Sequence, residues 1–101
     1  MLTMNEAHPT KVAPRLQLLR GLRNLKQTEL CDLLDIQKNT YNHYERGQNR
    51  PDVSNALKLC AFYGVTLDYL FSGNIAGLPH HMAIEITKAE ADITPSDRKA
   101  L

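Results

Sequence analysis

Residues 36–51, IQKNTYNHYERGQNRP, concentrate side chains that can form hydrogen bonds with a ligand. Within a stretch of helical length, two tyrosines alternate with four polar residues, namely Lys38, Asn39, Asn42 and His43. Asn and His are poor helix formers, so helix stability does not explain why they occur here. Amide, amine and imidazole groups on one face of a helix suit a polar partner instead. The segment therefore predicts a recognition surface, with an ordinary solvated helix face as the alternative.

Apolar residues at helical spacing predict an all-α fold, with five short helices between residues 13 and 73. The expected helices cover residues 13–25, 27–36, 37–45, 52–63 and 66–71. Pro14 suits the first turn of the first helix, and Asp52 and Thr66 are the expected N-caps of the last two. Gly64 is expected to end the fourth helix. The expected apolar face of that helix consists of Val53, Ala56, Leu57, Cys60 and Ala61.

Two short helices with a tight turn between them, and polar residues on the second, form the helix-turn-helix pattern. Residues 27–46 resemble it closely, and Asp35 tolerates the left-handed conformation of the turn. The longer segment 16–70 resembles the phage Cro/cI-type (XRE) DNA-binding domain, through the opening Gln27, the segment YERGQNRP and the closing GVTLDYL. This resemblance implies a five-helix, lambda-repressor-like DNA-binding bundle followed by a C-terminal extension. The sequence departs from the family at Lys26, Asp35 and Tyr41.

The resemblance implies that the third helix enters the major groove of DNA with its exposed residues facing the base edges. Asn39 and Asn42 can each bond the edge of adenine, and Lys38 can donate to guanine. His43 can donate to or accept from a base edge, or pack on a sugar. Lys38 lies at the positive end of the helix dipole, where a cation costs stability. A phosphate or a guanine near Lys38 would offset that cost, which favours a role in binding.

Residues beside the recognition helix are expected to hold the DNA backbone. The resemblance assigns this role to Gln27, because the N-terminal N–H groups of a helix suit a phosphate. The other expected phosphate contacts are Gln37, Thr40, Asn49 and Arg50. Gln37 also lies close enough to the groove to meet a base edge. The resemblance further implies a partly buried, structural ion pair between Arg20 and Glu45.

The 101 residues suggest one small domain with terminal segments. We expect a flexible N-terminal arm over residues 1–11, the DNA-binding domain over 12–74 and a C-terminal extension over 75–101. Residues 79–91 favour a helix, although the alternation around 83–87 also suits a strand, and the last nine residues look loose. Residues 1–51 hold eight Lys/Arg against five Asp/Glu, whereas the remainder holds four against six. The cationic first half hints at a polyanionic partner.

Other classes of protein find little support. No run approaches the ~20 apolar residues of a membrane span, and the first residues lack the pattern of a signal peptide. We therefore expect a cytoplasmic protein encoded by a bacterium or a phage. Cys31 and Cys60 lie in apolar segments, which predicts buried thiols rather than a disulfide or a metal site. His80 and His81 have no clear third partner, so we expect no metal, no cofactor and no catalysis.

Together these patterns predict a sequence-specific transcriptional regulator that binds a double-stranded DNA operator as a homodimer. One such unit covers a half-site, so the two recognition helices would lie about 34 Å apart, one turn of B-DNA. The dimer interface is expected at Leu70 and Phe71 or along residues 78–91. The alternative function is an antitoxin that neutralises a partner toxin through residues 75–101 and autoregulates its operon. A degenerate domain without DNA binding is disfavoured by the polar third helix.

Overall fold

The computed structural model describes residues 5–92, which form six α-helices and, within that range, no strand. The helices are α1 (Pro9–Leu22), α2 (Gln27–Leu34), α3 (Lys38–Glu45), α4 (Val53–Tyr63), α5 (Leu67–Ser72) and α6 (His80–Ala91). The all-α prediction is confirmed, and α2 to α5 begin and end within two residues of the expected positions. No helix in the described range is long and apolar enough to cross a membrane.

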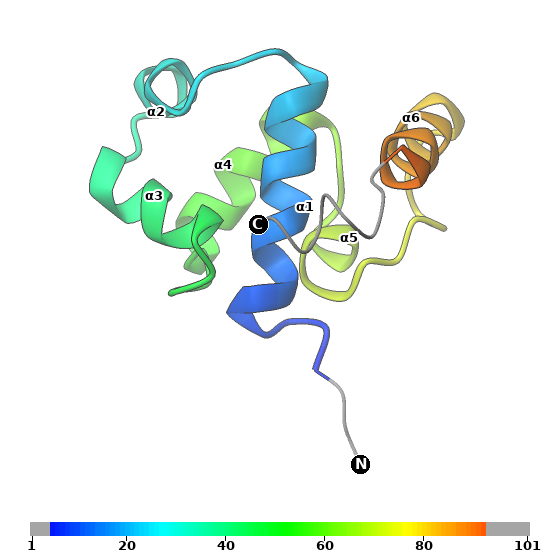
Figure 1. The fold of residues 1–101 in the computed structure, drawn as a ribbon, viewed down its shortest axis with the longest axis horizontal. Coiled ribbons are helices and arrows are strands. Elements are labelled where there is room, and N and C mark those ends of the chain that lie inside the picture. The colour runs from blue at the N-terminus through cyan, green and yellow to red at the C-terminus, as the bar shows by residue number, and fades with distance from the viewer. Residues whose placement is uncertain (1–4, 93–101) are drawn as a thin grey trace.

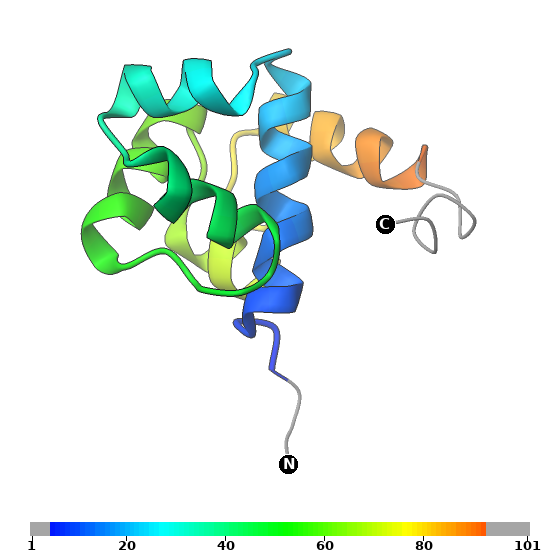
Figure 2. The same cartoon turned by 60° about the vertical axis from the view of Figure 1, so that its left-hand side comes forward.

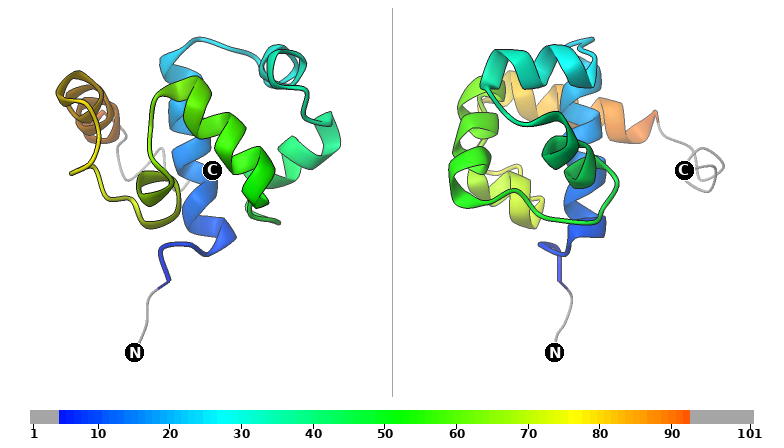
Figure 3. Two further views of the ribbon diagram at one scale, coloured as in Figure 1. Left: turned by 180° about the vertical axis from the view of Figure 1, so that it is seen from behind. Right: turned by 90° about the vertical axis from the view of Figure 1, so that its left-hand side faces the viewer.

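Helix α1 runs through the middle of the molecule, with α2 and α3 on one side and α5 and α6 on the other (Figure 1). Seen from behind, α4 lies across α1 (Figure 3, left). Leu16 and Leu19 of α1 are fully buried, as are the rings of Tyr41, Tyr63 and Tyr69 from three other helices. Burial of one such apolar side chain contributes ~1.5–3 kcal/mol. Helix α1 packs against α3, α5 and α6, while α2 packs against α3 and α4 against α5.

Helix α1 begins four residues earlier than expected, at Pro9. Pro9 lies in the first turn, where its missing N–H costs nothing, and the His8 side chain accepts a hydrogen bond from the backbone of that turn. Pro14, expected in the first turn, lies inside the helix on its exposed side. Residues 9–11, which were expected to belong to the N-terminal arm, are instead the first residues of α1.

The buried face of α4 also differs from the expected one. It consists of Ala56, Leu59, Cys60 and Tyr63. The side chains of Val53 and Leu57 are instead 73% and 51% exposed, and Ala61 is exposed as well. Helix α4 is apolar on more than one stripe, so helical spacing allowed two choices of inner face. Packing against the other helices selected the stripe that carries the largest ring, that of Tyr63.

The C-terminal extension contains α6, so residues 80–91 form the favoured helix and not the alternative strand. Met82 and Ile86 of α6 are buried, as is Leu78 in the preceding turn. Helix α6 crosses α1 on the side away from α3 (Figure 2). The extension therefore completes the core of the same domain. The loose segment expected at the C-terminus, residues 93–101, lies outside the described residues.

The buried hydroxyl of Tyr69 is expected to make the core less stable as the pH rises above 10. Burial, followed by the nearby charge of Glu90, raises the pKa of the Tyr69 hydroxyl from 10.0 to about 12. A raised folded-state pKa means that the contribution of Tyr69 to stability is complete below pH 10 and is lost as the pH rises to 12. Tyr69→Phe should therefore reduce the slope of unfolding free energy against pH by about 1.4 kcal/mol per pH unit in that window. Urea unfolding at several pH values measures the slope, and an unchanged slope would contradict the assignment.

Candidate nucleic-acid interface

Helices α2 and α3 are joined by a tight turn at Asp35, whose φ of 55° and ψ of 54° lie in the left-handed region. The expectation that Asp35 adopts this conformation is confirmed. The backbone N–H groups of Asp35 and Ile36 both donate to the carbonyl of Cys31, the second at 3.1 Å, and so close the end of α2. Cys31 is buried in the core. Local chemistry thus sets the reversal of the chain that brings α3 beside α2.

Helix α3 has an inner face that is buried and an outer face that is open. Its buried residues are Tyr41, Tyr44 and Glu45. Lys38, Asn39 and His43 are exposed on the other face and Asn42 is half-buried, so the structure brings the four expected base-contacting residues together. The Lys38 amine lies 3.6 Å from the carboxylate of Asp32 on α2. Figure 2 shows α3 at the surface of the domain, with no other described element over its outer side.

Gln37 and Thr40, two of the expected phosphate contacts, are joined by a hydrogen bond between their side chains at the start of α3. The Thr40 hydroxyl donates to the side-chain carbonyl of Gln37 at 3.1 Å. That bond uses the acceptor of the Gln37 amide and leaves its NH2 group free to donate. Because phosphate oxygens only accept hydrogen bonds, this arrangement suits a phosphate or an acceptor on a base edge. Lys38 and Asn39 follow in the same turn, so both kinds of contact begin at one end of the helix.

Gln27 is more deeply involved in the fold than expected. Its Nε2 donates to the buried carboxylate of Glu45 at 3.1 Å, and its side chain is only half exposed. A carboxylate accepts but cannot donate, so the amide nitrogen must face inward. A phosphate at the start of α2 is then left with the second Nε2 hydrogen and the backbone N–H groups of that turn. The backbone N–H of Lys26 is already bound to Glu29, at 2.8 Å.

The loop after α3 supplies further cations. Asn49 and Arg50 are exposed, as the phosphate role requires, and one Arg50 nitrogen lies 3.4 Å from the backbone carbonyl of Ala7. Arg46, which caps the C-terminus of α3, is also exposed, and it was absent from the expected contacts. Its position directly after the last helical residue was a usable signal, because the expected contacts Asn49 and Arg50 follow in the same loop. Arg46 therefore joins the candidate backbone-contacting residues.

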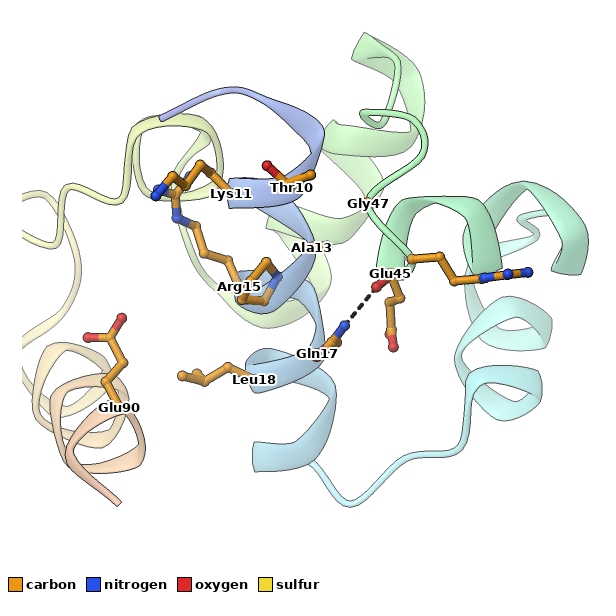
Figure 4. A pocket seen from close by; sticks show the side chains of 11 residues that line it. Thr10, Lys11, Ala13, Arg15, Gln17, Leu18, Glu45, Gly47 and Glu90 are labelled. Atoms are coloured by element: carbon orange, nitrogen blue, oxygen red, sulfur yellow. Dashed lines mark hydrogen bonds between the residues drawn. The ribbon is translucent and has the colours of Figure 1, made fainter. Parts of the chain in front are cut away.

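A shallow cavity of about 890 Å³ lies between the first half of α1, the loop after α3 and the end of α6. Lys11, Arg15 and Glu90 extend toward it from α1 and α6 (Figure 4). The dashed line in Figure 4 marks the bond from the Gln17 amide to the backbone carbonyl of Glu45, at 2.7 Å. None of the four expected base-contacting residues lines this cavity. The candidate interface is thus the exposed face of a helix and not a pocket.

The ion pair expected between Arg20 and Glu45 is present. The Arg20 Nε lies 2.6 Å from one carboxylate oxygen and a terminal nitrogen lies 2.8 Å from the other, while the side chain of Glu45 is only 4% exposed. The hydrogen bond to Glu45 raises the pKa of the Arg20 guanidinium. The hydroxyl of Tyr41 donates to the same carboxylate, and burial, then the Glu45 charge, raises the pKa of that hydroxyl. Tyr41 and Glu45 thus face the inside of the domain, where Arg20 meets them, and not the outer side of α3 that carries the expected base contacts.

Comparison with known proteins points to the same segment. The sequence model of the helix-turn-helix family matches residues 16–70. The chain is 33% identical over 73 residues to the cryptic phage CTXphi transcriptional repressor RstR of Vibrio cholerae, covering 72% of this chain and 66% of the relative. It is 34% identical over 62 residues to the SPbeta prophage-derived HTH-type transcriptional regulator YonR of Bacillus subtilis, covering 61% of this chain and 57% of the relative.

A further relative is the HTH-type transcriptional activator BcrR of Enterococcus faecalis, 32% identical over 59 residues, which are 58% of this chain and 29% of the relative. The matched part of the chain thus spans less than two thirds of the length of these relatives. No solved structure gives a significant match. The segment that the family model matches includes the turn at Asp35 and the whole of α3. The chain belongs to the XRE-type helix-turn-helix family.

Proposed function

We propose that the protein is a sequence-specific transcriptional regulator that binds an operator with α3 in the major groove. One observation carries the proposal: the outer face of α3 presents Lys38, Asn39 and His43 to solvent, while its inner face is buried in the domain. These three types of side chain match the donor and acceptor pattern of base edges. The face is held on a rigid helix, which suits the geometric demands of base recognition.

The proposed regulator binds its operator as a homodimer, because one domain of this size covers only one half-site. Leu70 is fully buried and Met82 and Ile86 are buried against α1, so most of the apolar surface first expected to form the interface serves the core. Among the described residues, six large apolar side chains remain exposed and open to a second copy, namely Leu33, Val53, Leu57, Leu67, Ile75 and Ile84. Val53 and Leu57 lie one turn apart on α4, and Ile84 belongs to the expected segment 78–91. The same burial of α6 lends no support to the alternative of a toxin-binding antitoxin.

The test is binding to the DNA immediately upstream of the gene, compared with an unrelated duplex of equal length across a salt series. The proposal predicts a preference of at least about 1,000-fold for one upstream site, with two protomers bound per site. Stoichiometry can be measured by analytical ultracentrifugation of the complex. Equal and steeply salt-dependent binding to both duplexes would show phosphate contacts alone and contradict base recognition.

Arg46 is expected to contribute one phosphate contact. Arg46→Ala should weaken binding to the operator and to the unrelated duplex by the same factor, because phosphates carry no sequence information. The slope of log affinity against log salt concentration should fall by about 1. The matched control is Lys88→Ala, which removes an exposed cation from α6, on the far side of α1. A change confined to the operator, or an equal change in the control, would contradict the assignment.

A further inference from the structure

The carboxylate of Glu45 accepts hydrogen bonds from four donors inside the domain. One oxygen accepts from Arg20 Nε at 2.6 Å and from the hydroxyl of Tyr41. The other accepts from a terminal nitrogen of Arg20 at 2.8 Å and from the Gln27 amide at 3.1 Å. A carboxylate offers about four lone-pair positions, so this one is saturated. Its bonds reach three helices: Arg20 belongs to α1, Gln27 opens α2, and Tyr41 and Glu45 belong to α3.

The bond from Tyr41 differs in kind from the other three. Tyr41 and Glu45 are four residues apart on the same helix, so this bond does not connect two elements. It instead holds the carboxylate of Glu45 in the orientation that reaches Arg20 and Gln27. The terminal torsion of a glutamate side chain is broad, so the bond from Tyr41 adds to the restraint that Arg20 and Gln27 place on the carboxylate. The ring of Tyr41 is fully buried, which keeps its hydroxyl in place.

We propose that Tyr41 is a positioning residue for base recognition, acting through Glu45. By orienting the carboxylate, its hydroxyl sets the position of α3 relative to Gln27 at the start of α2. This inference rests on the proposed function and adds a residue to it that touches no DNA. Tyr41 is also one of the three positions at which the sequence departs from the family that it resembles.

The relative position of α2 and α3 matters because each has a separate task in the proposed complex. Phosphate contacts at the start of α2 position the protein, whereas base contacts from α3 specify the sequence. Hydrogen bonds to base edges weaken steeply when their angles change. Binding to phosphates depends mainly on charge and tolerates a small shift of α3 against α2, whereas such a shift misplaces Asn39 and Lys38 against the base edges. The expected result is a loss of specificity with little loss of non-specific affinity.

The experiment compares Tyr41→Phe with Tyr44→Phe. Both residues are buried on the inner face of α3, and each substitution removes one hydroxyl and keeps the ring. The hydroxyl of Tyr44 accepts a hydrogen bond from Asn55 of α4 at 2.9 Å and does not reach Glu45. For each variant, affinities for the operator and for an unrelated duplex are measured at one salt concentration. The side-chain amide signals of Gln27 are followed by NMR without DNA.

Tyr41→Phe should lower the ratio of operator to non-specific affinity by about tenfold, with non-specific affinity changed by less than about twofold. Tyr44→Phe should lower that ratio by less than about threefold. Faster solvent exchange of the Gln27 side-chain amide is expected only in Tyr41→Phe. An equal loss of specificity in both variants, or an unchanged Gln27 signal in Tyr41→Phe, would overturn the inference. A parent protein with no preferred duplex would overturn the proposed function, whereas the Gln27 signal tests the link to Tyr41 separately.

Discussion

Replacement of Arg20 by alanine is expected to lower the free energy of unfolding by about 3 kcal/mol, and the midpoint of thermal unfolding by more than about 10 °C. The reason is the carboxylate of Glu45, which is almost fully buried and would lose its only cationic partner among the described residues. Gln27 and Tyr41 would remain as neutral donors and cannot neutralise the charge. The expected loss of about 3 kcal/mol is at the lower end of what breaking a buried ion pair costs, because the Arg20 side chain is 24% exposed. Urea unfolding and calorimetry measure the change.

The matched control is Lys11→Ala, which removes an exposed cation from the same helix without breaking a described ion pair. It should change stability by less than about 0.5 kcal/mol. A second variant separates the stranded charge from lost packing. Adding Glu45→Gln to Arg20→Ala should recover part of the loss, because a neutral amide is cheaper to bury than an unpaired carboxylate. A midpoint for Arg20→Ala within about 2 °C of the parent would contradict a structural role for the pair.

Asn39→Ala is expected to weaken binding to the operator by about 10- to 100-fold, equivalent to 1–3 kcal/mol for one bidentate base contact. Asn39 is exposed and bonds to no other described side chain, so the fold should keep its stability. Affinity for an unrelated duplex should hardly change, since phosphates are not its partners. Selection of binding sites from a randomised library by the variant should show relaxed preference at one base pair of each half-site.

Asn49→Ala serves as the control, because Asn49 is also an exposed asparagine but lies in the loop after α3. Its loss should weaken operator and unrelated duplex alike. If instead Asn39→Ala weakened both duplexes equally, Asn39 would be a backbone contact. If it weakened neither, the base-contacting set would have to be sought elsewhere on α3, at Asn42 or His43.

The parts of the fold that depend on neighbouring residues could be predicted from the sequence. The Asp52 carboxylate accepts from the backbone N–H of Asn55 at 2.8 Å, and Gly64 ends α4 with a φ of 74°. The left-handed conformation of Asp35 could likewise be predicted, because aspartate tolerates that conformation better than most residues. Each of these contacts spans only a few residues, so residue type and spacing are sufficient to predict it. The polar outer face of α3 belongs to the same class, because a helix places residues four apart on one side.

Predictions failed where two local solutions were equally good. Pro9 and Pro14 both suit a first helical turn, and the cap at His8 favoured the earlier one. Helix α4 carries two apolar stripes, and only its neighbours could decide that Leu59 and Tyr63 face inward while Val53 faces out. Burial is a property of the assembled core, so periodicity within one element cannot choose between such alternatives.

The sequence by itself determined the class of fold, the helix-turn-helix unit and the residues offered at the surface of α3, since these follow from local spacing and residue chemistry. The tertiary structure decided which residues meet on the buried side of α3. The resemblance implied only the pair of Arg20 with Glu45, whereas the structure also brings Gln27, 18 positions before Glu45, to the same carboxylate. This contact makes Gln27 a link between α2 and α3. Such contacts depend on how helices cross. The order of residues along the chain does not contain that geometry until the core is packed.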